Sequence, residues 1–599
     1  MNIKQKIPAI ILFVFFASLY IYTAAPGVYT GDSGEIATAV NTLGLAHPTG
    51  FPLYMMTGKL FTLVVPIKDV AYRLNIFSAL LTATALVFIY YTLRNLNNSP
   101  FASLTASFVL GLGRNTIWAN AGYANVYSLS LFFNSLLFFI FSKWRKEQKP
   151  KYLYWYGFLW GLSLGTHALM LVMAIPFLFM LWQERQVFKQ KITVLVKTIF
   201  LLILPFVQYL YLPLAYRRNG IVNWGDLSSL DGFIYYITQR QYAGKMFANT
   251  SSDAVTFLAK VAGLLTSEFT IIFFGLAVIG LITLFKKDKA LFVIFISIIL
   301  ANIGLMFGYG NSEGDAIILF RYLFIANTAL ALAIAFGIDG IIDRVGVLNG
   351  HKRIIFLSVG IILVATFQLK NSYAFNDRKH NYLIEDTANN ILNNIEPKAV
   401  IISYIDHITG PLWYLQSLGH RQDVTVVAMQ LLTFDWYIKN MAGQYPEIFS
   451  KELININNDN ARLAALIKNN LASKPTYSVF NALGDSNSEK DFDFIPQGLL
   501  SRITPKGSAD IKAMALANKI IWDKYVMRNI KADIYPDEYL NFLAKTYALA
   551  LYDSGIAYYN AGFLEESLDA LQKSLEIFPH PTTKKNFDYI KQKKLSSER

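Results

Sequence analysis

The sequence contains no cysteine and few charged residues. Because none of its 599 residues is cysteine, a disulfide, a thiolate nucleophile and a thiolate metal site are all excluded. Only 16% of the residues are charged, whereas 54% are hydrophobic. This composition and a mean hydropathy of +0.36 are too apolar for an ordinary soluble enzyme. The chain is therefore expected to cross a membrane many times.

Motifs of several enzyme classes are also missing. Without a P-loop or a GxGxxG sequence, an ATPase or a dinucleotide-dependent enzyme is disfavoured. No HxH or HExxH spacing occurs, so no metal or other cofactor is expected, although Asp32, Glu35 and His47 could in principle ligate a cation. "GLSLG" (161–165) matches GxSxG only by letter, because it ends an apolar span instead of joining a strand to a helix.

The net charge of +14 has two interpretations. An excess of Lys and Arg is typical of proteins that bind nucleic acid. In a membrane protein, the same excess usually sets the topology and meets anionic lipid. We therefore expect membrane lipid, and not nucleic acid, as a partner.

Apolar stretches of roughly 13–24 residues recur along the first 370 positions, and most are long enough to span a bilayer. They lie at 7–25, 70–92, 101–113, 122–143, 153–166, 169–183, 192–213, 269–285, 290–308, 319–342 and 354–369. The first begins like a signal peptide, but its apolar run is too long for one, so we interpret it as a retained span. The sequence predicts a mainly α, polytopic membrane protein of about eleven transmembrane helices.

Every second connector between these stretches is basic. The basic connectors are "RNLNNSP", "KWRKEQKPK", "QERQVFKQK", "KKDK" and "DRVGVLNGHKR". By the positive-inside rule, the N-terminus is cytoplasmic and the C-terminal part lies on the opposite face, in a periplasm or a lumen. We expect a bacterial inner membrane with the outer connectors and the C-terminal domain in the periplasm.

The other connectors collect acids, amides, aromatic residues and arginines, which makes the outer face the predicted working face. Its arginines are Arg114, Arg217, Arg218, Arg240 and Arg321. An arginine at a membrane interface often only extends its side chain toward water. A cluster of arginines can instead hold a phosphate through paired hydrogen bonds. Arg240 and Arg321 lie in polar-aromatic contexts and are the better candidates.

The first outer connector, residues 30–61, is unusually rich in functional groups. Asp32 and Glu35 are three residues apart and would share one face of a helix. The pattern predicts two interfacial helices joined by a rigid turn at His47-Pro48. Asp32 could merely cap the first helix. However, ionisable groups at a lipid boundary are costly and usually functional.

The residues after position 370 resemble a soluble region. We expect an extracytoplasmic α/β domain at 371–500, with a helix at 382–394, strands at 399–404 and 424–429, and a helix at 411–419 between the strands. The segment 550–579 matches the tetratricopeptide (TPR) pattern, which predicts a helical TPR-like region at 501–599. Such a region could bind a protein or could simply cap the fold.

Several motifs together resemble one protein family. They are "GDSGE" and "LGLAHPTGFPLY" in the first outer connector, "RNTIWANAGYANVYSL", "GLSLGTHALMLVMAIP", "NWGD", "QRQY", "RYLF" and the block at 410–438. The chain is similar to the DUF2723 family, which is grouped with protein O-mannosyltransferases and includes the animal transmembrane protein 260. It departs from the family pattern at Thr49 and Leu227, where proline is usual, and at 404–409, where only Asp406 of an acidic motif is retained.

The resemblance implies a GT-C glycosyltransferase, with residues 1–370 as its transmembrane catalytic domain. Such enzymes take a sugar, here mannose or another hexose, from a polyprenyl-phosphate carrier and use no cofactor. An essential acid in the first outer connector maps onto Asp32, with Glu35 beside it. The acceptor would be a Ser or Thr hydroxyl of an extracytoplasmic protein.

The residues fit this chemistry. One carboxylate suffices as general base, because the leaving group is already a phosphate and needs positive charge instead of an acid. The candidates for binding the donor phosphate are Arg240, Arg321 and His47. The candidates for stacking on sugar or lipid are Trp118, Tyr123 and Trp224. A transporter or lipid-carrier flippase is the alternative, but it predicts charges within the spans. A non-enzymatic envelope assembly scaffold would leave the Asp32 segment unexplained.

Overall fold

The computed structural model divides the chain into two compact units. It describes residues 3–246, 249–250, 252–309, 320–344, 350–479 and 491–597. Unit 1 comprises Met1–Pro26, His47–Leu214 and Leu227–His380, and unit 2 comprises Gly27–Ala46, Ala215–Asp226 and Asn381–Arg599. The chain therefore enters unit 2 for twenty residues directly after the first apolar helix, and those residues contain Asp32 and Glu35.

Unit 1 is a bundle of helices. Its longer helices are α1 (Ile3–Tyr22), α3 (Pro52–Val64), α4 (Val70–Asn95), α5 (Pro100–Gly111), α7 (Tyr127–Glu147), α8 (Pro150–Ser163), α9 (Ala174–Gln183), α11 (Ile192–Ile203), α14 (Asp253–Lys287), α15 (Lys289–Tyr309), α17 (Phe324–Arg344) and α18 (Gly350–Asn376). Each of the eleven predicted apolar stretches overlaps a helix. Within the described residues, five helices are long and apolar enough to cross a membrane. The protein is thus an integral membrane protein, while the count of eleven spans stays a prediction.

Shorter helices complete unit 1 at the ends of the bundle. These are α6 (Ile117–Ala121), η1 (Ala168–Met173), α10 (Arg185–Gln190), η2 (Leu204–Leu210), α13 (Leu230–Ile237) and η3 (Arg240–Lys245). Helix α12 (Tyr211–Arg217) follows η2 in the chain and has residues in both units. Several of them lie in the connectors that were predicted to be polar.

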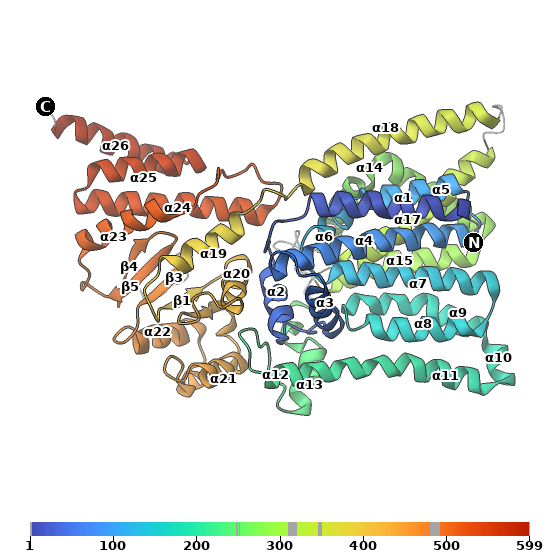
Figure 1. Ribbon diagram of the computed structural model, residues 1–599, viewed down its shortest axis with the longest axis horizontal. Coiled ribbons are helices and arrows are strands. Elements are labelled where there is room, and N and C mark those ends of the chain that lie inside the picture. The colour runs from blue at the N-terminus through green and yellow to red at the C-terminus, as the bar shows by residue number, and fades with distance from the viewer. Residues whose placement is uncertain are drawn as a thin grey trace. The chain divides into compact units, whose positions relative to one another are not determined.

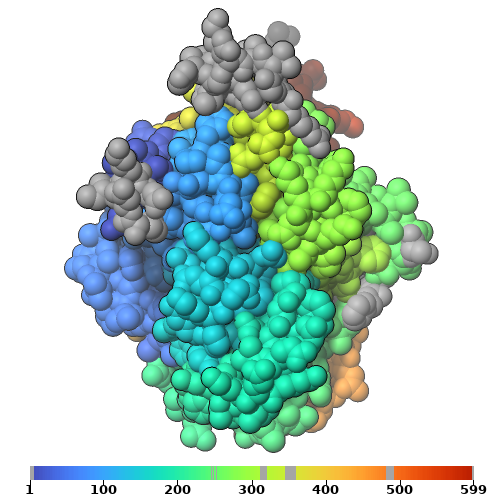
Figure 2. All heavy atoms as spheres, turned by 90° about the vertical axis from the view of Figure 1, so that its right-hand side faces the viewer, coloured from blue at the N-terminus to red at the C-terminus, as the bar shows by residue number. Residues whose placement is uncertain are grey.

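The basic connectors meet at one end of unit 1. Arg145, in the last turn of α7, forms a 2.8 Å ion pair with Asp288, which lies between α14 and α15. Ser99, between α4 and α5, donates its N–H and its hydroxyl to Asp339 near the end of α17. Helices α4, α7, α14 and α17 pack side by side (Figure 1). Figure 2 looks onto this end, where the blue, cyan and green segments form one continuous surface. These contacts bring described residues of the basic connectors together at one end of unit 1, whereas the orientation of this end in a membrane stays a prediction.

Unit 2 contains a mixed five-stranded sheet in the order β2-β1-β3-β5-β4. Its strands are β1 (Val400–Ser403), β2 (Thr425–Ala428), β3 (Thr476–Val479), β4 (Phe492–Gln497) and β5 (Leu500–Pro505). Strand β1 is parallel to β2 and β3, whereas β5 is antiparallel to β3 and β4. Helix α20 (Asp406–Ser417) joins β1 to β2, as the sequence predicted, because parallel neighbours need a crossover.

The helices of unit 2 come before, between and after these strands along the chain. They are α2 (Ser33–Thr42), α19 (Leu383–Asn393), η4 (Met429–Leu431), α21 (Asp435–Gln444), η5 (Lys451–Asn455), α22 (Asp459–Asn470), α23 (Ile511–Lys524), α24 (Glu538–Ala561), α25 (Leu564–Ile577) and α26 (Pro581–Ser597). Helix α24 packs on α25, and α25 packs on α26 (Figure 1). The α24–α25 pair is close at Gly555, whose carbonyl accepts a 2.7 Å hydrogen bond from Ser567. This is a helical hairpin; its assignment as a tetratricopeptide repeat stays a prediction, as does the division of the region at residue 500.

Helix α2, which follows Asp32, is packed against α20 within unit 2. Residues 33–40 are all buried, so α2 is not the exposed interfacial helix that its sequence pattern predicted. The two backbones approach closely at Gly34 and Gly410, where a Cβ on Gly34 would lie 2.4 Å from the carbonyl carbon of Gly410. Asn41 adds a 3.0 Å hydrogen bond to the carbonyl of Ser417. Gly34, the one glycine of α2, permits this close contact, which a single amphipathic face could not reveal.

Gly34→Ala is expected to destabilise the α2–α20 contact. Since the clashing atoms on the other side are backbone, the helices must separate, at a cost of about 1–3 kcal/mol. Thermal unfolding of the purified protein in detergent would measure the effect. Gly443→Ala is the matched control, because Gly443 lies in α21 with no atom within 4 Å of its added Cβ. Equal stability of the two variants would contradict the proposed close contact.

His407, in the first turn of α20, makes unit 2 sensitive to acid. Its ring is buried against Tyr539 and Phe542, with centroids 5.0 and 5.7 Å away. Burial lowers the pKa of His407 to about 4, and the negative charge of Asp537 offsets this only in part. The folded protein therefore holds His407 neutral, and its Nε2 has no hydrogen-bond partner among the described residues.

Because of His407, we expect the free energy of unfolding to decrease as the pH falls. Its pKa is lower in the folded than in the unfolded chain, so the stabilisation is complete above about pH 6.5 and is lost between about pH 6.5 and 4, by ~3 kcal/mol. His407→Phe keeps the ring packing but cannot titrate. Melting temperatures at neutral pH and near pH 4.5 should therefore differ less in this variant than in the wild type. An unchanged difference would show that His407 does not titrate in this way.

Candidate active site

Asp32 occupies the N-cap position of α2, yet its side chain does not cap the helix. Its carbonyl accepts a 2.8 Å hydrogen bond from the N–H of Ile36, but its carboxylate accepts none from the first turn. A capping aspartate would make that bond. Glu35 lies in the first turn and is only 7% exposed. Helix capping therefore does not account for the acid at position 32.

The turn before α2 is held in place by residues of unit 2. Gly31 has a φ of 62°, a left-handed conformation that suits glycine. Thr30 donates a 3.0 Å hydrogen bond to the carboxylate of Asp537, the N-cap residue of α24. The N–H of Tyr29 donates to the hydroxyl of Ser33 at 3.1 Å. These contacts fix the backbone on both sides of Asp32.

Two arginines of unit 1 converge on the ring of Tyr123. The guanidinium carbon of Arg321 lies 5.9 Å from the ring centroid and that of Arg378 lies 5.3 Å from it. All three side chains are almost fully buried, with exposed fractions of 5%, 6% and 3% for Arg321, Arg378 and Tyr123. Arg378 also donates to the carbonyl of Ala119 at 2.9 Å. We call Tyr123, Arg321 and Arg378 the arginine–tyrosine cluster.

The segment that carries Tyr123 is anchored by a buried carboxylate. Glu268, in α14, accepts hydrogen bonds from the N–H groups of Asn115, Thr116 and Ile117, at 2.6, 3.0 and 3.1 Å. These N–H groups lie at the start of α6, where a helix leaves its first donors without partners. Glu268 therefore fixes the segment between α5 and α7, and with it the position of the cluster.

The other candidates for binding a phosphate, His47 and Arg240, differ in their surroundings. His47 contacts Phe51 edge-on, and Phe51 in turn stacks on His167. Arg240 begins η3, is 54% exposed and lies 3.9 Å from the carboxylate of Asp231. Their role in phosphate binding stays a prediction.

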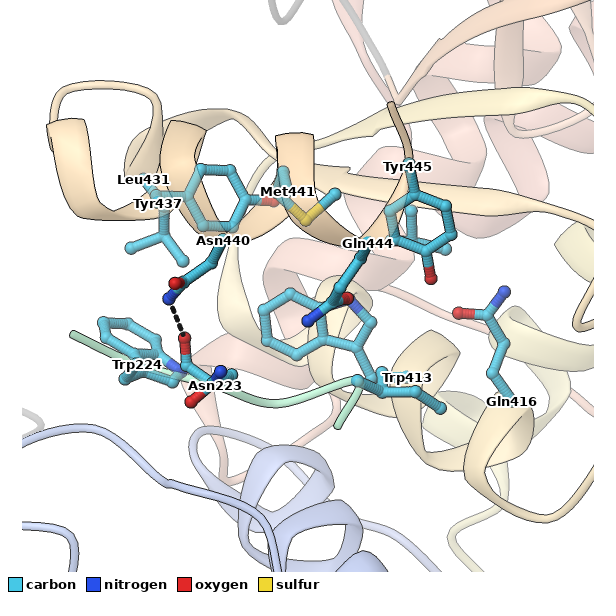
Figure 3. A pocket seen from close by; sticks show the side chains of 12 residues that line it. Asn223, Trp224, Trp413, Gln416, Leu431, Tyr437, Asn440, Met441, Gln444 and Tyr445 are labelled. Carbon is cyan, nitrogen blue, oxygen red and sulfur yellow. Dashed lines mark hydrogen bonds between the residues drawn. The ribbon is translucent and has the colours of Figure 1, made fainter. Parts of the chain in front are cut away.

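The tryptophans predicted to meet a substrate differ in position. Trp118 is fully buried in unit 1, where its Nε1 donates a 3.0 Å hydrogen bond to Thr23 and its ring packs near Tyr373. The ring is thus enclosed by neighbouring side chains, and a contact with sugar or lipid stays a prediction. Trp224 belongs to unit 2 and lines a pocket (Figure 3). The centroid of its ring lies 6.0 Å from that of Trp436.

Sequence reasoning missed Arg378 and Glu268. Arg378 follows the last apolar helix, where an arginine usually only anchors the helix end. Glu268 directly precedes the predicted span at 269–285, and nothing in its neighbours indicates which backbone groups it binds. In the ranges that the structure describes, no three His, Asp or Glu residues come together as metal ligands. The cluster itself offers positive charge through its two arginines.

Two family models and two curated proteins match parts of this chain. The family described as "Protein O-mannosyl-transferase TMEM260 N-terminal domain" matches residues 32–191, which begin at Asp32 and include Tyr123. A second family, "TMEM260-associated domain 2", matches residues 384–492. The chain is 27% identical to the Mus musculus protein named Protein O-mannosyl-transferase TMEM260, over 74% of this chain and 65% of that protein.

A more distant relative and a solved structure extend the similarity. The Dictyostelium discoideum protein named Protein O-mannosyl-transferase tmem260 is 23% identical over 83% of this chain and 66% of its own length. The chain thus spans about two thirds of the length of these curated relatives. The structure of ArnT from Cupriavidus metallidurans bound to undecaprenyl phosphate is similar with a TM-score of 0.53, 11% identity, and coverage of 85% of this chain and 98% of that chain. This likeness supports the expected GT-C type of fold.

Proposed function

We propose that the protein is a membrane glycosyltransferase that moves mannose from a polyprenyl-phosphate carrier to Ser or Thr hydroxyls of proteins. The arginine–tyrosine cluster carries this proposal, because two guanidinium groups that converge on one ring suit a phosphate, which each can bind through two hydrogen bonds. The names of the relatives supply the sugar and the class of acceptor. The undecaprenyl phosphate of the ArnT structure supplies the class of carrier.

The reaction needs one base and one site of positive charge. Asp32 accepts the proton of the acceptor hydroxyl while its oxygen bonds to the anomeric carbon of the sugar. The bond between that carbon and the phosphate oxygen breaks, and the carrier phosphate leaves with the electron pair. Arg321 and Arg378 stabilise the charge that develops on the phosphate. No general acid is required, because a phosphate is a good leaving group.

Glu35 has two possible roles in this scheme. It is buried one turn from Asp32, so it can tune the charge near the base or can serve only to stabilise the start of α2. Arg240 and His47 remain further candidates for the donor. We propose that catalysis takes place on the face opposite the basic connectors, which the positive-inside rule assigns to the outside.

A transfer assay tests the proposal directly. Purified protein in detergent is incubated with polyprenyl-phosphate mannose and a peptide rich in Ser and Thr. The mass of the peptide is then measured by mass spectrometry. We expect a mass increase of one hexose on a hydroxyl. Replacing the lipid donor with GDP-mannose should give no transfer. Hexose transfer from GDP-mannose alone, or none from any polyprenyl donor, would contradict the proposal.

A further inference from the structure

The C-terminal half of helix α18 carries a stripe of buried polar side chains. Between residues 359 and 376, the buried positions are Gln368, Ser372 and Asn376, which are spaced four apart and so lie on one face of the helix. The packed face of a helix is usually apolar. Buried polar side chains instead have hydrogen-bond partners. The stripe therefore indicates specific contacts between α18 and its neighbours.

Two of these contacts are made with the chain between α5 and α6. Ser372 donates a 2.7 Å hydrogen bond to the carbonyl of Leu112, and Asn376 donates a 2.9 Å hydrogen bond to that of Arg114. Leu112 is the C-cap residue of α5, and Arg114 follows it before α6 begins. Glu268 accepts hydrogen bonds from the N–H groups that come next. Helices α14 and α18 thus hold one short segment, the first through its N–H groups and the second through its carbonyls.

Asn376 makes a further contact, with Arg378 of the arginine–tyrosine cluster. The Nδ2 of Asn376 donates to the carbonyls of Arg114 and Ser372, at 2.9 and 3.0 Å. Because a carbonyl can only accept, these two bonds decide which end of the amide is the nitrogen. The Oδ1 at the other end accepts a 3.1 Å hydrogen bond from the Nη2 of Arg378. Backbone carbonyls therefore orient the amide, and the amide orients the guanidinium.

The guanidinium of Arg378 is also held from other sides within unit 1. Its Nη1 donates to the carbonyl of Ala119 at 2.9 Å, and its carbon lies 5.3 Å from the centroid of the Tyr123 ring. A Cβ on Gly122 would lie 2.9 Å from the same Nη1, so the chain passes very close to it. Together with the bond to Asn376, these contacts fix the plane of the guanidinium. Paired hydrogen bonds to a phosphate have to lie in that plane.

We propose that Asn376 is a positioning residue for the donor phosphate and that it acts through the orientation of Arg378. That a phosphate binds at Arg378 rests on the proposed function. An amide suits this role, because its oxygen accepts a hydrogen bond and carries no net charge. The bond to Asn376 therefore orients the guanidinium without offsetting its positive charge. A carboxylate at this position would form an ion pair and weaken the attraction for a phosphate.

Gln368 offers a matched comparison two turns earlier on the same face of α18. Its Nε2 also donates to two carbonyls, those of Val109 at 3.2 Å and Glu268 at 2.8 Å. It is buried, as Asn376 is. However, its Oε1 has no hydrogen-bond partner among the described residues. Loss of either amide removes two hydrogen bonds to carbonyls, whereas only the loss of Asn376 removes a hydrogen bond to an arginine of the cluster.

Binding of undecaprenyl phosphate to the full-length protein in detergent, followed by native mass spectrometry, tests this role. Asn376→Ala should weaken binding about tenfold, the scale of one hydrogen bond to a charged group. Gln368→Ala should bind as the wild type does, although both variants should lose similar thermal stability. Undecaprenol, which has the same chain without the phosphate, should bind all three proteins equally. Equal weakening of phosphate binding in the two variants would overturn the proposal, because the effect would then come from the fold.

A double-mutant cycle shows whether Asn376 acts through Arg378. In an Arg378→Ala background, Asn376→Ala should cause no further loss of undecaprenyl phosphate binding, since the group that it orients is gone. Additive losses would overturn the proposal, as would a wild-type protein that does not bind this lipid.

The transfer assay with the mannose-charged donor separates this inference from the proposed function. A wild-type protein that binds undecaprenyl phosphate through Arg378 and Asn376 but transfers no mannose would refute the proposed function and leave this inference intact. Normal transfer by the wild type, together with equal binding losses in Asn376→Ala and Gln368→Ala, would do the reverse.

Discussion

Asp32→Asn should lower the rate of mannose transfer by a factor of about 100 to 10,000, the usual contribution of a general base. The substitution removes the negative charge and the proton acceptor while it keeps the size of the side chain. Asparagine caps helices as well as aspartate does. If Asp32 served only as the N-cap residue of α2, the substitution would therefore leave both stability and activity intact. The rate is measured with saturating donor lipid and acceptor peptide.

Asp69→Asn provides the matched control for this prediction. Asp69 is the N-cap residue of α4 and does accept a capping hydrogen bond, 2.8 Å from the N–H of Tyr72. Asparagine can replace it, so transfer should be normal. Glu35→Gln should reduce the rate less than Asp32→Asn does, since the base remains. Wild-type transfer by a folded Asp32→Asn protein would remove Asp32 from the mechanism.

Arg321→Ala should lower kcat/KM for the polyprenyl-phosphate donor by a factor of about 100, the size expected when one donor to a developing anion is lost. Arg378→Ala should act in the same direction. Because Arg378 also bonds the carbonyl of Ala119, its variant needs a parallel measurement of thermal stability. Arg321→Lys keeps the charge but cannot form two parallel hydrogen bonds, so it should recover only part of the activity.

The control for the arginine variants lies at the other end of unit 1. Arg185, in α10, is exposed and stacks on Trp182, with its guanidinium 4.7 Å from the ring centroid. Arg185→Ala removes the same charge from the protein and should leave donor kinetics unchanged. If Arg321→Ala and Arg185→Ala affected donor kinetics equally, the effect would reflect overall charge instead of a phosphate site.

Local patterns determined much of this protein. Long apolar runs and the alternation of basic connectors predicted helices and the grouping of loops at one end of unit 1, because both depend on neighbouring residues and on charge. The same holds for the β1–α20–β2 unit, whose strands and helix each carry their own periodicity. The sequence also indicated a special role for the segment around Asp32, through its density of acids, glycines and prolines.

Only the tertiary structure decided which of these residues meet. Arg378 is 255 positions from Tyr123 in the chain, and no periodicity connects them. The burial of α2 depends on Gly410, whose missing side chain matters only because Gly34 lies against it. Trp118 and Trp224 look alike in sequence, yet one is enclosed in a core and the other lines a pocket. Composition and periodicity fix what a segment can form, whereas long-range packing fixes what its side chains touch.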